Sequence, residues 1–183
     1  MSGRILVTSR AEKAAEARRL GFDVEQQALD LPEPQALDPG EIIETKARVA
    51  FERLGRAILV EDSGLSVEAW GGFPGALVKW MEKSVGLEGI ARMLDGFSDR
   101  RATAVCVVAS LDERGLTVGR GECRGSIART PRGTGGFGWD RLFVPDGSAL
   151  TFAEMTPEEK DRVSHRRRAW EALARQLSGG VEP

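Results

Sequence analysis

Two adjacent carboxylates stand where an apolar segment of the chain meets a polar one. Residues Ala57–Val60 are typical of a buried strand, and the run Glu61–Gly64 follows them directly. Neighbouring carboxylates repel each other, and a hard cation such as Mg²⁺, which binds carboxylate and phosphate oxygens, relieves that repulsion. The pattern therefore predicts a metal site at Glu61 and Asp62. The alternative is a turn in which Asp62 caps the backbone and Glu61 faces water, a frequent use of Asp-Ser-Gly.

Four further residues could serve the same site. Glu33 lies in the acidic, proline-rich loop DLPEPQALDPG and is a candidate metal ligand, although a loop carboxylate is commonly just solvated. Lys46 and Lys79 are candidate phosphate contacts, although an exposed helical lysine ordinarily serves only solubility. Ser63 follows the acidic pair and is a candidate substrate contact.

A second candidate site is the turn between the first predicted strand and the first predicted helix. Hydroxyls, backbone N–H groups and two cations gather there at a helix N-terminus, an arrangement that can bind phosphate oxygens. The same residues also fit a Ser or Thr helix cap with solvated Arg10 and Lys13 side chains, and both interpretations stay open. The sequence has no Walker A pattern. The candidate phosphate-binding residues are Thr8, Ser9, Arg10, Ala11, Glu12 and Lys13.

A third candidate site joins an aromatic segment to the last predicted helix. Lys160 and Ser164 are four residues apart, so one continuous helix would place them on the same face. Arginine and histidine can pair with O6 and N7 of a 6-oxopurine, and an aromatic ring can stack on its face. The alternative is an aromatic core pair beside a solvated basic helix face. The candidate base-binding residues are Phe137, Gly138, Trp139, Asp140, Lys160, His165 and Arg166.

The elements that must position these residues alternate between strands and helices in the first half of the chain. Short apolar runs predict strands, and longer runs with polar and apolar faces, ended by Gly21 and Gly55, predict helices. After Val60 the glycine-rich segment GGFPGA requires an irregular backbone. The predicted elements are a strand at Ile5–Val7, a helix at Ala11–Leu20, a strand near Val24–Gln27, a helix from about Glu41 to Leu54 and the strand Ala57–Val60.

The second half predicts helices, a hairpin and a final helix. The turn signal at Asp112–Gly115 separates two β-rich stretches, which is typical of an antiparallel hairpin. A long glycine- and proline-rich loop with one short strand follows, and a helix that starts with Thr156 as its cap ends the fold. The predicted helices are Val78–Lys83 and Leu87–Leu94, and the predicted hairpin strands are Ala102–Leu111 and Leu116–Ile127.

Length and composition predict one globular α/β domain over residues 1–183, with 178–183 as a frayed tail. A net charge of -2 argues against a broad cationic surface and therefore against nucleic acid as a partner. No apolar run approaches the roughly 20 residues of a membrane-spanning helix, so no membrane association is expected. With only Cys106 and Cys123, and no apolar signal stretch at MSGRILV, we expect a reduced, cytoplasmic protein.

Taken together, the motifs resemble the inosine triphosphate pyrophosphatase family. The matching segments occur in family order over nearly the whole chain, and separate signatures such as VEDSGL, GGFPG, FGWD, TFAEM and SHR would seldom align by chance. The resemblance implies a two-lobed α/β fold with a long mixed β-sheet flanked by helices, a central nucleotide cleft and a homodimer. The segments are TSRAEK, DLPEPQ, LVEDSGLSVEAWGGFPGALVKW, GTGGFGWDRLFVPDG, TFAEMTPEEK and SHR.

The resemblance also implies an activity and residue roles. The implied reaction is hydrolysis of ITP, dITP and XTP between the α and β phosphorus atoms, which gives the monophosphate and pyrophosphate. At matching positions Glu33, Glu61 and Asp62 surround Mg²⁺. Asp62 is the general base, and Lys13 acts with it on the phosphates.

The sequence departs from the family pattern in two segments. Relatives usually have T-G-N-x-x-K where this chain has Ser9 and Arg10, and Arg141 replaces the usual proline after FGWD.

Three other functions fit parts of the sequence. They are a related pyrophosphatase for pyrimidine or methylated nucleotides, a nucleotide-binding protein without turnover, and an RNA-binding module built on the arginines at 166–168.

Overall fold

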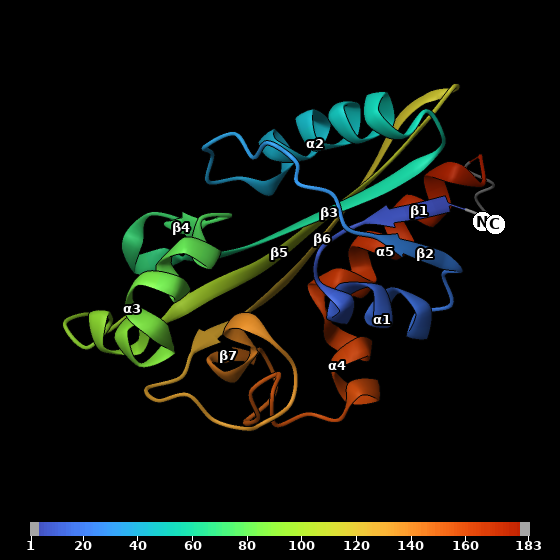
Figure 1. Ribbon diagram of the computed structural model, residues 1–183. Helices are drawn as coiled ribbons and strands as arrows, with labels where there is room; N and C mark the ends of the chain where they lie inside the picture. The colour runs from blue at the N-terminus through green and yellow to red at the C-terminus, as the bar shows by residue number, and fades with distance from the viewer. Residues whose placement is uncertain (1–3, 180–183) are drawn as a thin grey trace.

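A long mixed β-sheet forms the centre of the computed structural model, which describes residues 4–179 (Figure 1). Within that range the strand order is β2-β1-β3-β5-β6-β7, and the short β4 pairs with the far end of β3. This arrangement confirms the predicted α/β class with a mixed sheet. The strands are β1 (Arg4–Val7), β2 (Val24–Gln27), β3 (Ile58–Val67), β4 (Pro74–Gly75), β5 (Arg101–Asp112), β6 (Gly115–Ile127) and β7 (Phe143–Pro145).

The sheet is parallel at one edge and antiparallel elsewhere. β1 pairs in parallel with β2 and with the start of β3. Ile5–Val7 and Ile58–Val60 are buried on both faces of the sheet, which explains their continuous apolar runs. β5 and β6 form the predicted antiparallel hairpin, whose register runs from Arg101 opposite Ser126 to Asp112 opposite Gly115.

Helices cover both faces of the sheet. On one face, Ile43 and Ala47 of α2 pack with Ile58 and Val60 of β3. On the other, α1 and α5 cover Leu59 (Figure 1). None of the helices within residues 4–179 is long and apolar enough to cross a membrane. The helices are α1 (Ala11–Arg19), α2 (Pro39–Leu54), α3 (Val78–Met93), α4 (Pro157–Val163) and α5 (His165–Leu177), with 3-10 turns η1 (Glu68–Trp70) and η2 (Gly138–Arg141).

A third apolar cluster lies at the far end of the long strands. It joins α3 to β3, β5 and β7, with Phe143 and Phe152 fully buried at its centre. α3 is interrupted at Gly86, whose φ of 68° only glycine adopts readily, so the two helices predicted on either side of it are present. Figure 1 shows α3 and β4 at this end of the sheet, and β1, β2, α1 and α5 toward the other end. The candidate site residues come from both ends.

Gly75 brings the acidic loop against the sheet. A Cβ at this position would lie 2.1 Å from the carbonyl oxygen of Leu37, so only glycine allows that approach. The N–H of Ala76 then donates to the same carbonyl at 2.7 Å. The GGFPGA segment therefore fixes the loop that carries Glu33.

Two predicted boundaries were wrong. β3 does not end at Val60 but continues to Val67, because Glu61–Val67 keep their antiparallel pairing with β5. The final helix is two helices, since Ser164 has an extended backbone (φ -69°, ψ 146°) and accepts a hydrogen bond from the N–H of Arg167 as the cap of α5. Of the predicted frayed tail, residues 180–183 lie outside the described range, and Ser178 caps α5.

Candidate active site

The candidate residues border two connected hollows. A long groove of about 860 Å³ is lined by the β1–α1 turn, the acidic loop and α3. A small inner cavity of about 70 Å³ lies between η2, α3 and the start of α5. Arg10, Lys13, Glu33, Asp62 and Lys79 line both hollows, so a single extended ligand could occupy the two together.

The β1–α1 turn presents an uncapped helix N-terminus to the groove. Arg10 is the N-cap residue, and its side chain makes no capping hydrogen bond; the hydroxyl of Thr8 instead accepts from the N–H of Arg10 at 3.1 Å. Thr8, Ser9, Arg10 and Lys13 line the groove. The alternative of a Ser or Thr helix cap is therefore wrong, because Arg10 occupies the N-cap position and Thr8 accepts only from the N–H of Arg10 within residues 4–179. Phosphate binding at this turn stays a prediction.

The continuation of β3 separates the two predicted acidic residues. Successive side chains of a strand point to opposite faces, so Glu61 lies with α1 and α5 while Asp62 lies with α2. The structure therefore does not bring the Glu61 and Asp62 carboxylates together around one ion. The alternative turn at Asp-Ser-Gly is also wrong, because these residues belong to the strand.

Asp62 and Glu33 instead share an ammonium group on one wall of the groove. The Nζ of Lys46 is 3.1 Å from Glu33 and 3.6 Å from Asp62, and the Nζ of Lys79 is 3.6 Å from Glu33. Burial raises the pKa of the Glu33 carboxyl, but the two lysines outweigh this effect and hold its pKa below the usual value. Burial lowers the pKa of Lys46, and its two carboxylate partners more than reverse that change. Glu33 and Lys46 are therefore both charged at neutral pH.

This pair of carboxylates fits Mg²⁺ better than a metal that needs a complete protein cage. Within residues 4–179 no group of three or more His, Cys, Asp or Glu side chains is arranged to hold a metal ion. Mg²⁺ is commonly held by one or two carboxylates together with substrate phosphates. Glu33 and Asp62 are the residues that could hold such an ion on this groove wall, where both pair with Lys46.

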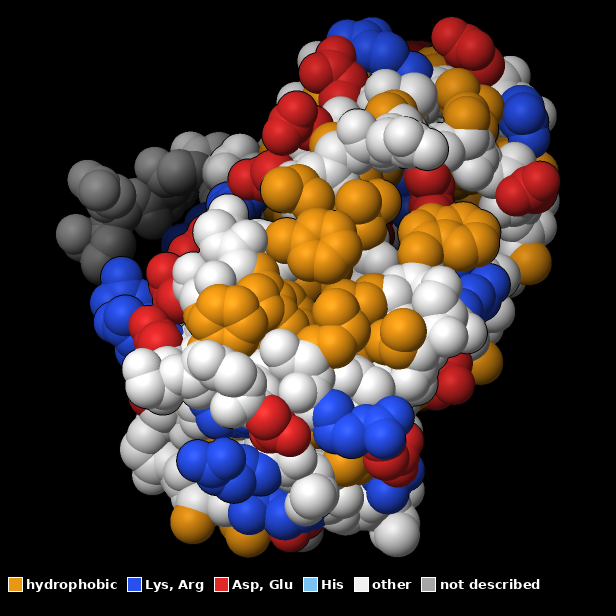
Figure 2. Space-filling model, turned by 90° about the vertical axis from the view of Figure 1, so that its left-hand side faces the viewer, with side chains coloured by type: hydrophobic (Ala, Val, Ile, Leu, Met, Phe, Trp, Pro, Cys, Tyr) orange, Lys and Arg blue, Asp and Glu red, His pale blue; other side chains and the backbone are white. Residues whose placement is uncertain are grey.

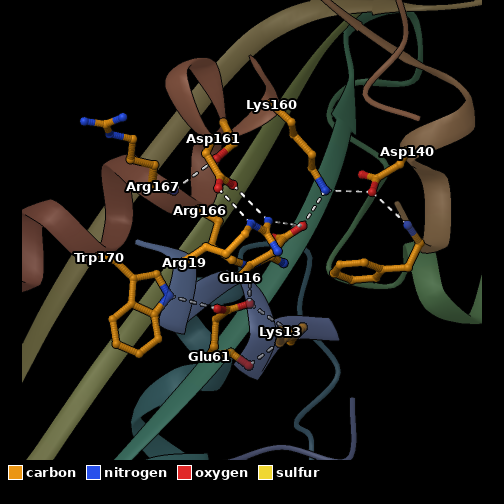
Figure 3. Close-up of polar contacts among 12 residues, drawn as sticks. Lys13, Glu16, Arg19, Glu61, Asp140, Lys160, Asp161, Arg166, Arg167 and Trp170 are labelled. Atoms are coloured by element: carbon orange, nitrogen blue, oxygen red, sulfur yellow. Dashed lines mark hydrogen bonds and ion pairs between the residues drawn. The ribbon is translucent and has the colours of Figure 1, made fainter. Parts of the chain in front are cut away.

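Glu61 belongs to a buried ionic network (Figure 3). Its Oε1 accepts from Nε of Arg166 at 2.9 Å, and its Oε2 accepts from the indole N–H of Trp170 at 3.1 Å. Burial raises the pKa of the Glu61 carboxyl, but Arg166 and then Lys13 lower it below its usual value. The side chain of Glu61 has no exposed surface and its carboxylate is held by Arg166 and Trp170, while the residue forms part of the groove wall.

Glu16 completes this network and was missed from the sequence. It pairs with Lys160 at 2.7 Å and with Arg166, whose Nη1 donates to Oε2. Burial raises the pKa of Glu16, but Arg166 and Lys160 lower it to about 2. The sequence did contain one indication of this buried position. Glu16 follows Lys13 by three residues, so the two side chains lie on the same face of α1 as the buried Ala14 and Ala17.

Lys160 and Arg166 act in the structure mainly as buried ion-pair partners. Lys160 donates to Asp140 at 2.7 Å as well as to Glu16, and Asp140 also accepts from the backbone N–H of Phe137. Both cations lie near the Phe137 ring, with Nζ of Lys160 5.1 Å and the guanidinium carbon of Arg166 5.2 Å from its centroid. The network thereby fixes the aromatic segment that borders the inner cavity.

His165 brings two unpaired nitrogens to the inner cavity. Its ring is buried, stacks on Phe152 at 5.9 Å and contacts Trp139 at 5.3 Å. Neither Nδ1 nor Nε2 has a hydrogen-bond partner among residues 4–179. Burial lowers the pKa of His165 well below its usual value, and the nearby Arg166 and Lys160 lower it further. A neutral imidazole can donate from one nitrogen and accept at the other, so it suits a ligand that offers both.

Stability should depend on pH through His165. The folded state keeps the ring neutral, whereas the unfolded chain binds a proton below pH 6.5, so falling pH favours unfolding. We expect the free energy of unfolding to fall by about 1 kcal/mol between pH 7.5 and 5.5. His165 is the only histidine. Urea titrations of His165→Phe should lack this change, and an equal pH dependence in that variant would contradict the assignment.

The structure brings most of the predicted residues to the two hollows and leaves a few outside. Ala11 and Glu12 begin α1 and are exposed but line neither hollow. Lys160 lies behind the cavity wall, and Ser164 is a helix cap. The predicted residues that line a hollow are Thr8, Ser9, Arg10, Lys13, Glu33, Lys46, Glu61, Asp62, Ser63, Lys79, Phe137, Gly138, Trp139, Asp140, His165 and Arg166.

Comparison with known proteins gives consistent matches along the chain. The sequence profile described as the Ham1 family matches residues 4–176. A dITP/XTP pyrophosphatase of Methanopyrus kandleri is 43% identical over 164 residues, 89% of this chain and 87% of its own. Inosine triphosphate pyrophosphatase 1 of Trypanosoma cruzi is 45% identical over 152 residues, with coverage of 82% and 78%. The structure of the Staphylococcus aureus Ham1 protein superposes with a TM-score of 0.82 at 26% identity, over 97% of this chain and 99% of its own.

Proposed function

This chain belongs to the Ham1 family, and from that premise we propose that it hydrolyses ITP, dITP and XTP to the nucleoside monophosphate and pyrophosphate. One observation carries the proposal. A groove with Asp62, Glu33 and several lysines runs into a cavity lined by aromatic rings and His165. The groove suits the phosphates of a nucleotide, and the cavity suits its purine base.

The groove residues have separable roles in the proposed reaction. The N–H groups of the uncapped α1 N-terminus bind phosphate oxygens, and Lys13, Lys46 and Lys79 neutralise their charge. Mg²⁺, held by Glu33 and Asp62 with the phosphates, would supply further charge neutralisation.

Asp62 is the proposed general base. It takes a proton from the water whose oxygen bonds to the α-phosphorus, while the bond from that phosphorus to the α–β bridging oxygen breaks and pyrophosphate leaves. One carboxylate oxygen accepts from the N–H of Ser63 at 2.9 Å, and the other lies 3.6 Å from Lys46. Two separate contacts thus hold the carboxylate in one orientation.

The inner cavity is the proposed base site. Hypoxanthine and xanthine present the O6 acceptor where adenine presents the N6–H₂ donor. Neutral His165 can donate to O6 or N7, and the Phe137 ring offers a stacking face. A mismatched base leaves buried groups unpaired, which costs about 1–3 kcal/mol for each group.

The RNA-binding alternative finds no support in the arginine run. Arg166 is buried, Arg167 pairs with Glu171 at 2.6 Å, and Arg168 donates to the carbonyl of Glu122. These side chains therefore form no open basic strip for a phosphate backbone.

Pyrophosphate release tests the proposal directly. With Mg²⁺ present, we expect kcat/KM for ITP, dITP and XTP to exceed that for ATP by about 100-fold, because adenine mismatches the base site. EDTA should remove the activity. A protein that binds ITP but releases no pyrophosphate would establish the binding-protein alternative, and preference for pyrimidine nucleotides would establish the related pyrophosphatase.

We also place the protein in the cytoplasm as a homodimer. Two buried, free cysteines support a reducing compartment. Figure 2 shows an apolar patch on the face that carries α3, and Phe73, Trp80, Val85 and Met93 are exposed there beside the groove. Such a patch is typical of a protein interface. Sedimentation velocity should give a dimer mass, and Trp80→Glu should shift it to the monomer.

A further inference from the structure

We propose that the carboxylate of Glu82 reads the base by accepting a hydrogen bond from N1–H of a 6-oxopurine, which makes Glu82 a specificity residue. The inference rests on the proposed function, since it places a purine in the inner cavity. It concerns a residue that neither the acidic motif nor the final helices include.

Glu82 reaches the inner cavity from the side opposite the final helices. It lies in the first half of α3 and lines the same hollow as Phe137, Trp139 and His165. Its Oε2 is 3.7 Å from the position that a Cβ on Gly138 would occupy. Because Gly138 has no side chain, the carboxylate faces bare backbone at the cavity wall.

The carboxylate of Glu82 has no partner within residues 4–179, unlike the other acidic groups at the site. Glu33 and Asp62 pair with Lys46, and Asp140 pairs with Lys160. Glu82 is half-buried. A partly desolvated carboxylate without a hydrogen-bond donor is unfavourable, so a donor on a bound ligand would stabilise it.

The chemistry of a carboxylate selects among purines. An ionised carboxylate only accepts hydrogen bonds, and hypoxanthine and xanthine both carry a donor at N1. Adenine has an unprotonated N1, whose lone pair would face the negative oxygens. Guanine carries N1–H and N2–H₂, and both can donate to one carboxylate. Glu82 therefore discriminates against adenine but admits guanine.

The matched amide variant tests this role. Glu82→Gln keeps the shape and can donate to N1 of adenine, so we expect the ratio of kcat/KM for ITP over ATP to fall about tenfold, mainly through KM. Glu88→Gln is the control, because Glu88 is exposed beyond the break at Gly86 on the same helix. The control should keep the wild-type ratio and urea midpoint.

A second substrate isolates the N1 contact. ITP methylated at N1 has lost the donor, so the wild-type kcat/KM for it should be about tenfold lower than for ITP. Glu82→Ala has no carboxylate to lose, so its kcat/KM should be nearly the same for the two substrates. An active, folded Glu82→Gln protein with an unchanged ratio would overturn the role of Glu82 alone. A wild-type protein that hydrolyses none of these nucleotides would overturn the proposed function, and the premise of this inference with it.

Discussion

Replacing Asp62 with asparagine is expected to lower kcat for ITP by about 10²- to 10⁴-fold, the usual contribution of a general base. The amide can still accept from the N–H of Ser63, so the side chain keeps its orientation, but it cannot take a proton from water. Nucleotide affinity should change only a few-fold because the phosphate contacts of Lys13 and Lys79 remain. Pyrophosphate release at saturating ITP and calorimetric binding of ITP measure the two effects separately.

Glu44→Gln is the matched control for this variant. Glu44 is an exposed carboxylate on α2 that pairs with Arg48 and lies outside the groove. Its loss should leave kcat unchanged. If Asp62→Asn turns over ITP at the wild-type rate, or loses binding because it unfolds, Asp62 is not the general base.

Replacing Glu61 with alanine is expected to lower the free energy of unfolding by about 3–5 kcal/mol, the usual cost of removing one partner of a buried ion pair. The change leaves the buried Arg166 guanidinium with Glu16 alone and the indole N–H of Trp170 without an acceptor. Urea unfolding in EDTA, with no metal present, measures this effect.

Asp62→Ala separates this role from metal binding. Asp62 is partly exposed and has its Lys46 contact at 3.6 Å, so its removal should cost about 1 kcal/mol or less. If Glu61 were only a metal ligand, Glu61→Ala would not be destabilised in EDTA. If the free energy of unfolding of Glu61→Ala falls by as little as that of Asp62→Ala, the structural role of Glu61 is contradicted.

The buried carboxylate of Glu16 should stay ionised in moderate acid. Glu16, with its pKa lowered to about 2, contributes stability above pH 4.5 that is lost as pH falls from 4.5 towards 2. A decrease in the free energy of unfolding between pH 7.5 and 5.5 is therefore attributed to His165, and the histidine can be tested in that pH range.

Local sequence was sufficient for the parts that depend on neighbours along the chain. Apolar and β-rich runs predicted β1 and the β5–β6 hairpin, glycine predicted the break in α3, and the Thr156 cap predicted the start of α4. The separate motifs also predicted which segments carry the site. Propensity, capping and hydrophobic periodicity are short-range, so they can be read from a single chain.

Tertiary structure alone decided how charges pair. The pairing of β3 with β5 extended the strand through Glu61 and Asp62, and strand alternation then sent the two carboxylates to opposite faces. Glu16, more than 140 residues from its cationic partners, became their shared acceptor. Glu82 lines the cavity with a carboxylate that has no partner within residues 4–179. Each outcome depends on which distant segments lie side by side, because a charge is stabilised by whatever surrounds it in space.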